Sequence, residues 1–328
     1  MKRRSFIKTT SIFAGSIAAT RLLSSSAKAQ EIKELNFGII STESQANQKP
    51  IWEPFISAMS EQLGMPVKAF YATQYAGVIE AMRFGQVQLA WYGGKSYIEA
   101  AKIADAEVFA QTVNEDGTKG YYSHLIMNKN NPRVTEAKEL GGDNFVVQNA
   151  ADLTFAFNDP NSTSGYLVPS YYVFAKNGVN PKTAFERLIF AGNHEATALA
   201  VANEQVDVAT NNSESLSRLE KTNPQARENI EVVWTSTLIP SDPIAWRKDL
   251  PEDLKTQVKD FFYSYKDESV LGPLEWAGFD AAADNIWNPI RELDIGEKIL
   301  AIQANDNLPQ SEKDKQIAEL NQQLEAIE

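Results

Sequence analysis

Three consecutive hydroxyl side chains, Ser162, Thr163 and Ser164, stand where one predicted helix begins. They follow an Asp-Pro-Asn turn and precede an apolar segment, residues 166–176, whose spacing is helical. Hydroxyls and the unpaired backbone N–H groups of a helix start can point together at one tetrahedral oxyanion. The helix dipole adds roughly 0.3–1 kcal/mol for such an anion. Ordinary N-capping uses only one hydroxyl, so spacing alone leaves an anion site and a plain cap both open.

The two histidines of the chain stand in different settings. His194 follows Asn193, a good N-cap, and so falls in the first turn of a predicted helix, where the dipole disfavours imidazolium until an anion arrives. A lone histidine without serine and aspartate partners in the sequence is more often a capping or surface residue than a catalyst. His124 lies in an apolar strand expected over 122–127, and we interpret it as structural.

Two acids and two tyrosines complete the set of candidates. Glu214 is expected in the first turn of a helix, where a carboxylate is favoured by the dipole. Asp242 precedes a proline, which is a common turn pattern. Tyr75 and Tyr121 are equally consistent with half-buried aromatic side chains. Taken singly, none of these four residues predicts a function.

The composition of the 328 residues excludes much chemistry. The chain has 31 Lys and Arg against 43 Asp and Glu, a formal net charge of −12, whereas a nucleic-acid-binding protein needs a basic face. There is no cysteine, which excludes disulfides, Cys-ligated zinc, iron–sulfur clusters, thiol nucleophiles and a lipidated N-terminal cysteine. With two histidines, a multi-histidine metal site is nearly excluded. We therefore expect no metal, no cofactor and no nucleic-acid partner.

Residues 1–29 have the pattern of an export signal. They contain six Lys and Arg and no acid, a short uncharged middle, and an Ala-Lys-Ala end typical of a cleavage site. Arg3-Arg4, followed by Ser-Phe-Ile-Lys, resembles a twin-arginine signal; an ordinary secretory signal that carries two arginines is the alternative. Removing the six positive charges leaves 25 basic against 43 acidic residues, or −18. We expect an exported, soluble protein without a lipid anchor.

The rest of the chain alternates short apolar strands with helices, which predicts a mostly parallel sheet covered by helices on both faces. The first strand is expected over 35–40 and the first helix over 51–63, with Pro50 at its first turn. After residue 131 the alternation starts again. The sequence therefore predicts two similar α/β lobes.

The C-terminal tail, residues 286–328, becomes polar from about Gly296 and ends in a helix predicted over 311–327. Its apolar stripe consists of Ile317, Leu320, Leu324 and Ile327. Such a stripe docks either on the body of the protein, which is the simpler interpretation, or on a second copy to form a homodimer.

Together these features resemble one family. From about residue 35 to 279 the chain is similar to the phosphonate-binding periplasmic components of ABC transporters. The matching segments are LNFGIISTESQANQKPIWEPF (35–55), YAGVIEAMRFGQVQLAWYG (75–93), VFAQT (108–112), DPNSTSGYLVPSYYVFAKN (159–177), ALAVANEQVDVATNNSESL (198–216) and IPSDPIAWRK (239–248). Runs this long, in the right order, are far more specific than a short motif.

The resemblance implies an α/β fold of the two-lobe periplasmic-binding-protein type (type II), in which two lobes close on a ligand like a hinged clamp. We expect the chain to cross between lobes near Asn130 and near Pro240. Lobe 1 is then formed by 30–130 with 241–285, and lobe 2 by 131–240. The implied location is the periplasm, and the implied partner is an ABC transporter permease in the inner membrane.

The resemblance also implies roles for the candidates. The family's phosphonate-contacting Ser-Thr-Ser falls on Ser162, Thr163 and Ser164, its histidine on His194, and its ligand-contacting tyrosines on Tyr75 and Tyr121. Two acids that face the ligand's amino group match Glu214 and Asp242. Since both acids are present, the resemblance favours 2-aminoethylphosphonate over phosphite or methylphosphonate, which have no ammonium group.

Three functions follow from different assumptions. The first is a periplasmic receptor that delivers a phosphonate to a permease without chemical change. The second is an exported hydrolase or transferase that uses His194 with Glu214 or Asp242, although the sequence has no nucleophile–base signature and no nucleotide loop. The third is a sensor-type binding protein that presents its ligand to a signalling partner.

Overall fold

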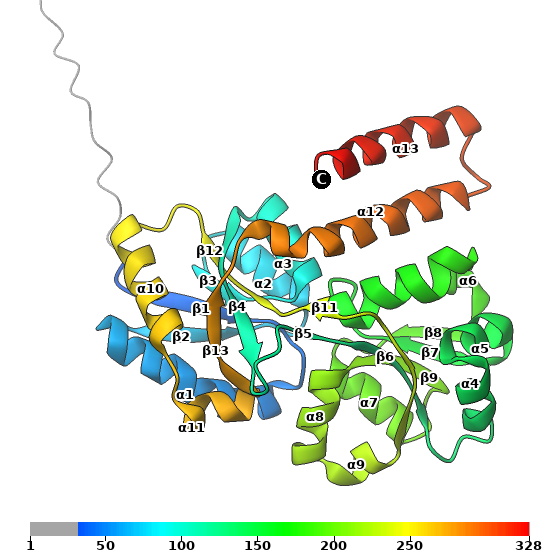
Figure 1. Cartoon of the computed structure of the whole chain (residues 1–328), viewed down its shortest axis with the longest axis horizontal. Coiled ribbons are helices and arrows are strands. Elements are labelled where there is room, and N and C mark those ends of the chain that lie inside the picture. The colour runs from blue at the N-terminus through cyan, green and yellow to red at the C-terminus, as the bar shows by residue number, and fades with distance from the viewer. Residues whose placement is uncertain (1–31, 328) are drawn as a thin grey trace, which may run out of the picture. The chain divides into compact units, whose positions relative to one another are not determined.

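The structure is a computed structural model that describes residues 32–327, so the predicted export signal lies outside the described residues. Within this range the strands form two large sheets and one short two-stranded ladder (Figure 1). No helix among the described residues is long and apolar enough to cross a membrane.

The first sheet has six strands in the order β13-β4-β12-β3-β1-β2. They are β1 (Leu35–Ile39), β2 (Val67–Tyr71), β3 (Leu89–Trp91), β4 (Ala106–Asn114), β12 (Pro243–Arg247) and β13 (Trp276–Ala281). β1 is parallel to β2 and β3, whereas β12 is antiparallel to β3 and β4, and β13 is antiparallel to β4. The sheet is therefore mixed, not mostly parallel as expected, because β12 and β13 enter it only after the chain has returned from the second sheet.

The second sheet has five strands in the order β10-β6-β9-β7-β8. They are β6 (Ser123–Asn128), β7 (Thr154–Phe157), β8 (Arg187–Phe190), β9 (Val208–Asn212) and β10 (Ile230–Thr235). Leu125 and Phe155 belong to one apolar cluster and Ile126 and Ala156 to another. Since successive side chains of a strand point to opposite faces, this sheet is buried on both faces, as the sequence predicted.

The two sheets are joined by the short ladder of β5 (Gly120–Tyr121) with β11 (Ile239–Pro240), which pair antiparallel. The second crossing therefore lies at Pro240, as expected. The first does not lie near Asn130, because β6 already pairs with β9 and β10 of the second sheet. The crossing falls before Ser123. We call the six-stranded sheet and its helices lobe 1, and the five-stranded sheet and its helices lobe 2.

An aromatic cluster forms the core of lobe 1. Phe55 packs within 6.3 Å of Phe37, Phe262 and Phe279, measured between ring centroids. The helices of this lobe are α1 (Gln45–Leu63), α2 (Tyr75–Arg83), α3 (Gly94–Ile103), α10 (Glu252–Ser264) and α11 (Glu268–Leu271). The rigid core fixes the loops that follow β1 and β3, which reach the other lobe.

Helix α1 begins six residues earlier than the predicted 51–63, with both Pro50 and Pro54 inside it. The backbone N–H groups of Asn47 and Gln48 donate to the Ser44 carbonyl. The buried Gln48 amide donates to the Ile40 carbonyl at 2.7 Å. This first turn is held by polar contacts, which an apolar periodicity does not detect.

The helices of lobe 2 include those that begin at or next to His194 and Glu214. They are α4 (Val134–Leu140), α5 (Gly142–Asn149), α6 (Pro181–Ala184), α7 (His194–Ala202), α8 (Ser213–Thr222) and α9 (Pro224–Glu228). The helix predicted over 166–176 is instead two π-helical turns, η2 (Thr163–Leu167) and η3 (Ser170–Phe174). Consequently Thr163 and Ser164 lie inside the first turn, and Ser162 is its N-cap.

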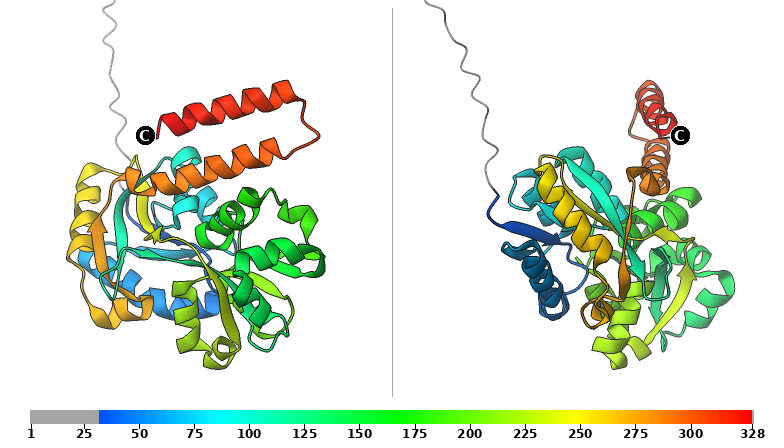
Figure 2. Two further views of the ribbon diagram at one scale, coloured as in Figure 1. Left: turned by 45° about the vertical axis from the view of Figure 1, so that its right-hand side comes forward. Right: turned by 60° about the vertical axis from the view of Figure 1, so that its left-hand side comes forward.

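The tail forms an antiparallel helix pair, α12 (Asn288–Gln303) and α13 (Gln310–Glu325), which lie side by side in all views (Figures 1 and 2). Helix α12 contacts α3 of lobe 1 and η3 of lobe 2. The predicted stripe of α13 is half-buried, and α13 packs on α12. The homodimer through this helix stays a prediction.

Candidate ligand-binding site

One cavity collects every site residue that the sequence predicted. Its lining contains Tyr75, Tyr121, Ser162, Thr163, Ser164, His194, Glu214 and Asp242, together with Ile40, Thr42, Trp91, Gly93, Asn212 and Arg218. Both lobes contribute to this lining. The free space among these side chains is about 10 Å³, room for roughly one water molecule. A larger ligand therefore enters only when the lobes move apart.

The hydroxyl cluster is positioned by the start of η2. Ser162 Oγ accepts hydrogen bonds from the Gly165 N–H at 2.9 Å and from the Asn158 amide at 3.2 Å, so this residue is the cap. Thr163 Oγ1 accepts from the backbone N–H of Lys95 in lobe 1 at 2.9 Å. Ser164 Oγ accepts from the Asn212 amide at 3.1 Å. A hydroxyl that accepts keeps its own proton to donate, which suits an anion.

His194 is buried beside these hydroxyls. Its Nε2 lies 3.2 Å from the amide nitrogen of Asn212 and 3.4 Å from Ser164 Oγ. Because an amide nitrogen only donates, Nε2 accepts and the ring proton is on Nδ1, which has no partner among the described residues. Burial, assisted by the positive charge of Arg218, lowers the pKa of His194 to about 3. The imidazole is thus a neutral N–H donor.

The two tyrosines complete the donor set. Tyr75 and Tyr121 are buried, with 2% and 4% of their surface exposed. Burial raises the pKa of both phenols above its ordinary value, and nearby acids raise it further. Both hydroxyls therefore keep their protons and can donate. Neither is the half-exposed aromatic that the simpler interpretation expected.

Two carboxyl groups form the other end of the cavity. Burial is the main cause that raises the pKa of Glu214 to about 7; Arg218 opposes the increase, and the neighbouring acids Glu275 and Glu43 add to it. Burial and then the charge of Glu214 also raise the pKa of Asp242. Asp242 Oδ1 has no hydrogen-bond partner among residues 32–327. Acids held this close need a cation, so this end of the cavity suits an ammonium group.

Gly93 lies between the hydroxyl cluster and the acids, and its lack of a side chain leaves space between them. A Cβ atom at this position would lie 3.2 Å from Thr163 Oγ1 and 3.8 Å from Asp242 Oδ1. A side chain here would therefore occupy space between the hydroxyl cluster and the acids. The requirement is steric, since the backbone φ of Gly93 is −81°, which any residue adopts.

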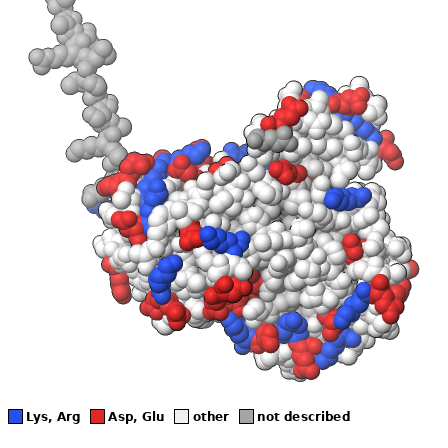
Figure 3. Space-filling view, viewed as in Figure 1, with Lys and Arg blue, Asp and Glu red and all other residues white. Residues whose placement is uncertain are grey.

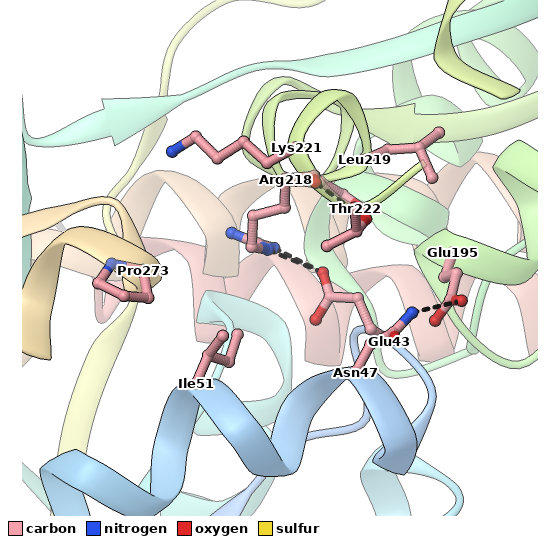
Figure 4. Close-up of a pocket in the computed structure, with 10 residues that line it drawn as sticks. Glu43, Asn47, Ile51, Glu195, Arg218, Leu219, Lys221, Thr222 and Pro273 are labelled. Carbon is pink, nitrogen blue, oxygen red and sulfur yellow. Dashed lines mark hydrogen bonds and ion pairs between the residues drawn. The ribbon is translucent and has the colours of Figure 1, made fainter. Parts of the chain in front are cut away.

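The mouth of the cavity is closed by contacts between the lobes, which Figure 4 shows around a second cavity of about 290 Å³. Arg218 Nη2 of α8 lies 2.8 Å from Glu43 Oε1 in lobe 1. Glu195 of α7 accepts from the Ser44 N–H and from the Asn47 amide, each at 2.7 Å. These pairs join the two lobes next to the site.

Glu275 of lobe 1 is a third acid, after Glu43 and Glu195, that contacts the other lobe here. Its backbone is strained. Its φ of 65° is in the left-handed region, which costs a non-glycine residue of the order of 1 kcal/mol. The carboxylate accepts from Ser217 Oγ at 2.6 Å and lies 2.9 Å from Lys221 Nζ. Contacts to the other lobe thus hold a conformation that is locally unfavourable.

Sequence reasoning missed Arg218, Asn212 and Glu43. The one available signal was the four-residue spacing of Glu214 and Arg218, which places both on one face of a helix. Asn212 is the N-cap of α8 and accepts from the Ser215 N–H at 2.6 Å while it donates to Ser164. An asparagine that already serves as a cap gives no separate sign of a binding role.

His194 lacks one of the partners that a catalytic histidine uses. Among the described residues, His194 has no carboxylate within hydrogen-bonding distance, since its Nε2 contacts Asn212 and Ser164 and its Nδ1 has no partner. A general base needs an orienting acceptor as well as a nucleophile in reach, and of these two only the Ser164 hydroxyl is present among the described residues. His124, interpreted as structural, lies in the second sheet with its Nδ1 3.0 Å from Thr235 Oγ1.

Two lobes joined by paired crossing strands, with a polar cavity between them, define a ligand-binding protein of the two-lobe periplasmic type. The family model described as "ABC transporter, phosphonate, periplasmic substrate-binding protein" matches residues 37–287. The chain belongs to this family.

The relatives agree with this assignment. The "Phosphonates-binding periplasmic protein" of Escherichia coli (strain K12) is 45% identical over 320 residues, which cover 96% of this chain and 92% of that protein. A solved binding-protein component of an ABC phosphonate transporter from Pseudomonas aeruginosa has a TM-score of 0.85 and 46% identity, over 90% of this chain and 96% of that one. A Prochlorococcus marinus protein solved with methylphosphonate has a TM-score of 0.67 and 24% identity, over 80% and 97%, and this likeness shows the fold alone.

Proposed function

We propose that this protein captures an alkylphosphonate with a positively charged end, 2-aminoethylphosphonate in the first place, in the cavity between its lobes. It then delivers the ligand unchanged to an ABC transporter permease in the inner membrane. The observation that carries the choice of ligand is the pairing of two opposite chemistries in one cavity. Neutral donors line one end, and the two acids Glu214 and Asp242 line the other.

The phosphonate end is assigned to Ser162, Thr163, Ser164, His194 and Tyr121. Each offers a proton without a net positive charge, and charge-assisted hydrogen bonds to an oxyanion contribute roughly 1.5–3 kcal/mol each. The whole chain does not attract an anion, because its formal net charge is −12. On the face in Figure 3 basic and acidic side chains are interspersed, without a broad basic patch. Recognition therefore depends on the local donors.

The ammonium end is assigned to Glu214, Asp242 and Tyr75. Placing an ammonium group between the two carboxyl groups satisfies Asp242 Oδ1, which has no partner among the described residues, and relieves the repulsion between the acids. Methylphosphonate and phosphite bring no positive charge to this end. Each would leave Asp242 Oδ1 without a partner and the repulsion between the two acids unrelieved, so a receptor for either ligand does not need this pair.

Export fits the same function. The twin-arginine pattern at Arg3 and Arg4 leads us to propose that the chain is exported and cut near Gln30, and that it acts in the periplasm as a soluble protein. Replacement of Arg3 and Arg4 by lysine blocks export if the twin-arginine route is used and leaves export unchanged if the general secretory route is used.

Calorimetric titration of the exported protein tests the ligand. We expect 2-aminoethylphosphonate to bind more tightly than methylphosphonate, phosphite or phosphate. A preference for phosphate or phosphite contradicts the role of the two acids. Glu214→Ala is expected to weaken 2-aminoethylphosphonate far more than methylphosphonate, whereas equal losses show a structural role. Conversion of any of these ligands to a product contradicts a pure receptor.

A further inference from the structure

Arg218 is the buried cation nearest to the acids of the site, yet it does not pair with the acid on its own helix. Its Nε and Nη2 lie 2.9 and 2.8 Å from Glu43 Oε1, and its Nη1 lies 3.8 Å from Glu275 Oε2. The structure shows no ion pair within 4.0 Å between Arg218 and Glu214 in the described range. Figure 4 shows the guanidinium directed across to Glu43 above α1.

The partners that Arg218 contacts lie in the other lobe, whereas the acid that it does not contact lies on its own helix. Glu214 and Arg218 are four residues apart on α8, a spacing at which oppositely charged side chains reach one another. Both belong to lobe 2, whereas Glu43 follows β1 and Glu275 precedes β13, both in lobe 1. When the lobes separate, Arg218 loses Glu43 and Glu275 but keeps Glu214 within reach.

The closed lobes therefore leave Glu214 without a direct ion pair to its helix partner, although the charge of Arg218 still acts on the pKa of Glu214 against the effect of burial. Glu214 and Asp242 both line the cavity, and Arg218 is held by lobe 1 with 12% of its side chain exposed. Glu43 and Glu275 are similarly covered, with 11% and 13% exposed. In such a protected setting an acid without a direct ion pair is costly unless a cation makes contact with it.

We infer that Arg218 exchanges direct ion pairs when the lobes close: it gives up contact with Glu214 for contact with Glu43 and Glu275, and the positive end of the ligand makes the direct contact with Glu214. This inference rests on the proposed function. It makes Arg218 a positioning residue that couples lobe closure to the charge of the ligand, and it makes Glu43 and Glu275 determinants of specificity although neither belongs to the ammonium end.

Glu43→Gln tests the exchange, with 2-aminoethylphosphonate and ethylphosphonate as paired ligands that differ in the amino group. In the variant Arg218 stays with Glu214 and competes with the ligand's ammonium. The preference for 2-aminoethylphosphonate over ethylphosphonate is therefore expected to fall about tenfold. If Glu43 only holds the lobes together, the variant binds both ligands more weakly by the same factor. An unchanged preference therefore overturns the exchange.

Glu195→Gln is the matched control, because Glu195 also joins the lobes at the mouth but contacts Ser44 and Asn47 instead of Arg218. It is expected to weaken both ligands by the same factor. A change in preference as large as that of Glu43→Gln contradicts the specific role of Arg218. If Glu43→Gln does not fold, Glu275→Gln acts on the same guanidinium, and it is expected to reduce the preference by a smaller factor.

Small-angle scattering adds a readout that is independent of affinity. With both ligands at saturating concentration, 2-aminoethylphosphonate is expected to compact the wild-type protein more than ethylphosphonate does. In Glu43→Gln the two ligands are expected to give the same radius of gyration. Equal compaction of the wild type by both ligands overturns the exchange, while failure of the wild type to bind either phosphonate overturns the proposed function itself and the exchange with it.

Discussion

The backbone N–H of Lys95 in α3 donates to Thr163 Oγ1 at 2.9 Å, across the two lobes. The Thr163 side chain thus belongs to the helix start that we propose binds the oxyanion, and it also contacts lobe 1. Under that proposal, lobe closure completes the environment of this hydroxyl and links ligand binding to closure.

Thr163→Val removes that hydroxyl while the shape of the side chain is nearly kept. We expect phosphonate affinity to fall roughly 10- to 100-fold, the equivalent of one charge-assisted hydrogen bond. Thr163→Ser keeps the hydroxyl and is expected to remain within a few-fold of the wild type. Calorimetry of both variants checks this, and a loss in Ser without a loss in Val assigns the role to the methyl group instead.

Gly93→Ala places a methyl group between Thr163 and Asp242, at the distances given above. We expect weaker binding of every phosphonate without a large change in melting temperature, because the added atom fills the ligand's space and the backbone conformation suits alanine. Binding at the wild-type level shows that the ligand lies elsewhere. A melting temperature that falls sharply shows that the glycine is needed for the fold.

The pH dependence of the amine preference follows from Glu214. Burial raises the pKa of Glu214 to about 7, Arg218 opposes the rise, and Glu275 and Glu43 add to it; Asp242 lines the same cavity, and the charge of Glu214 raises the Asp242 pKa. An ammonium group pairs with the ionised acid, so the preference for 2-aminoethylphosphonate over ethylphosphonate is expected to weaken as the pH falls from 8 to 5.5. Glu214→Gln removes this change, and a flat wild-type ratio contradicts it.

The contribution of Glu214 to the stability of the ligand-free protein changes with pH in the opposite direction to the amine preference. Since the pKa of Glu214 is higher in the folded protein, the folded state binds more protons than the unfolded state between about pH 4.5 and 7. Glu214 therefore contributes a decrease in the free energy of unfolding with rising pH in that window, of at most about 1.4 kcal/mol per pH unit, while His194 contributes an increase below about pH 6.5. The difference in slope between wild type and Glu214→Gln, measured by urea unfolding, isolates the contribution of Glu214.

His194 is expected to stay neutral throughout the physiological range, because burial and then Arg218 lower its pKa to about 3. Unfolding restores an ordinary pKa near 6.5, so this residue destabilises the fold as the pH drops below that value. NMR titration of the imidazole is expected to show no inflection between pH 5.5 and 8. An inflection near 6.5 contradicts the buried neutral donor.

Much of this site was predictable because its residues stand at helix starts. Ser162, His194 and Glu214 were each expected at the beginning of a helix, and a helix start in an α/β lobe lies at the end of a strand, where cavities form. The strand and helix order followed from apolar periodicity. The role of each residue, however, came from the resemblance to a family, since each had an equally good interpretation as a cap or a turn residue.

The parts that the sequence did not predict depend on partners far along the chain. Arg218 meets Glu43, which is 175 residues away, and the Arg218 side chain reaches it only because the lobes are together. The first crossing was misplaced for a similar reason. β6 was expected in lobe 1 by its position in the sequence, and only its pairing with β9 and β10 assigns it to lobe 2.

The position of β12 in the first sheet has a consequence for how the protein is made. β12 lies between β3 and β4, although it is synthesised after the whole of lobe 2. A nascent chain that ends before residue 243 can complete the five-stranded sheet, but it leaves a gap in the middle of the six-stranded one. During translation lobe 2 is thus the first unit that can fold completely. The gap in the sheet of lobe 1, which begins with β1, is filled only when β12, the second-last strand, has been made. Such long-range pairing slows folding, which lengthens the time in which the newborn chain needs protection from aggregation.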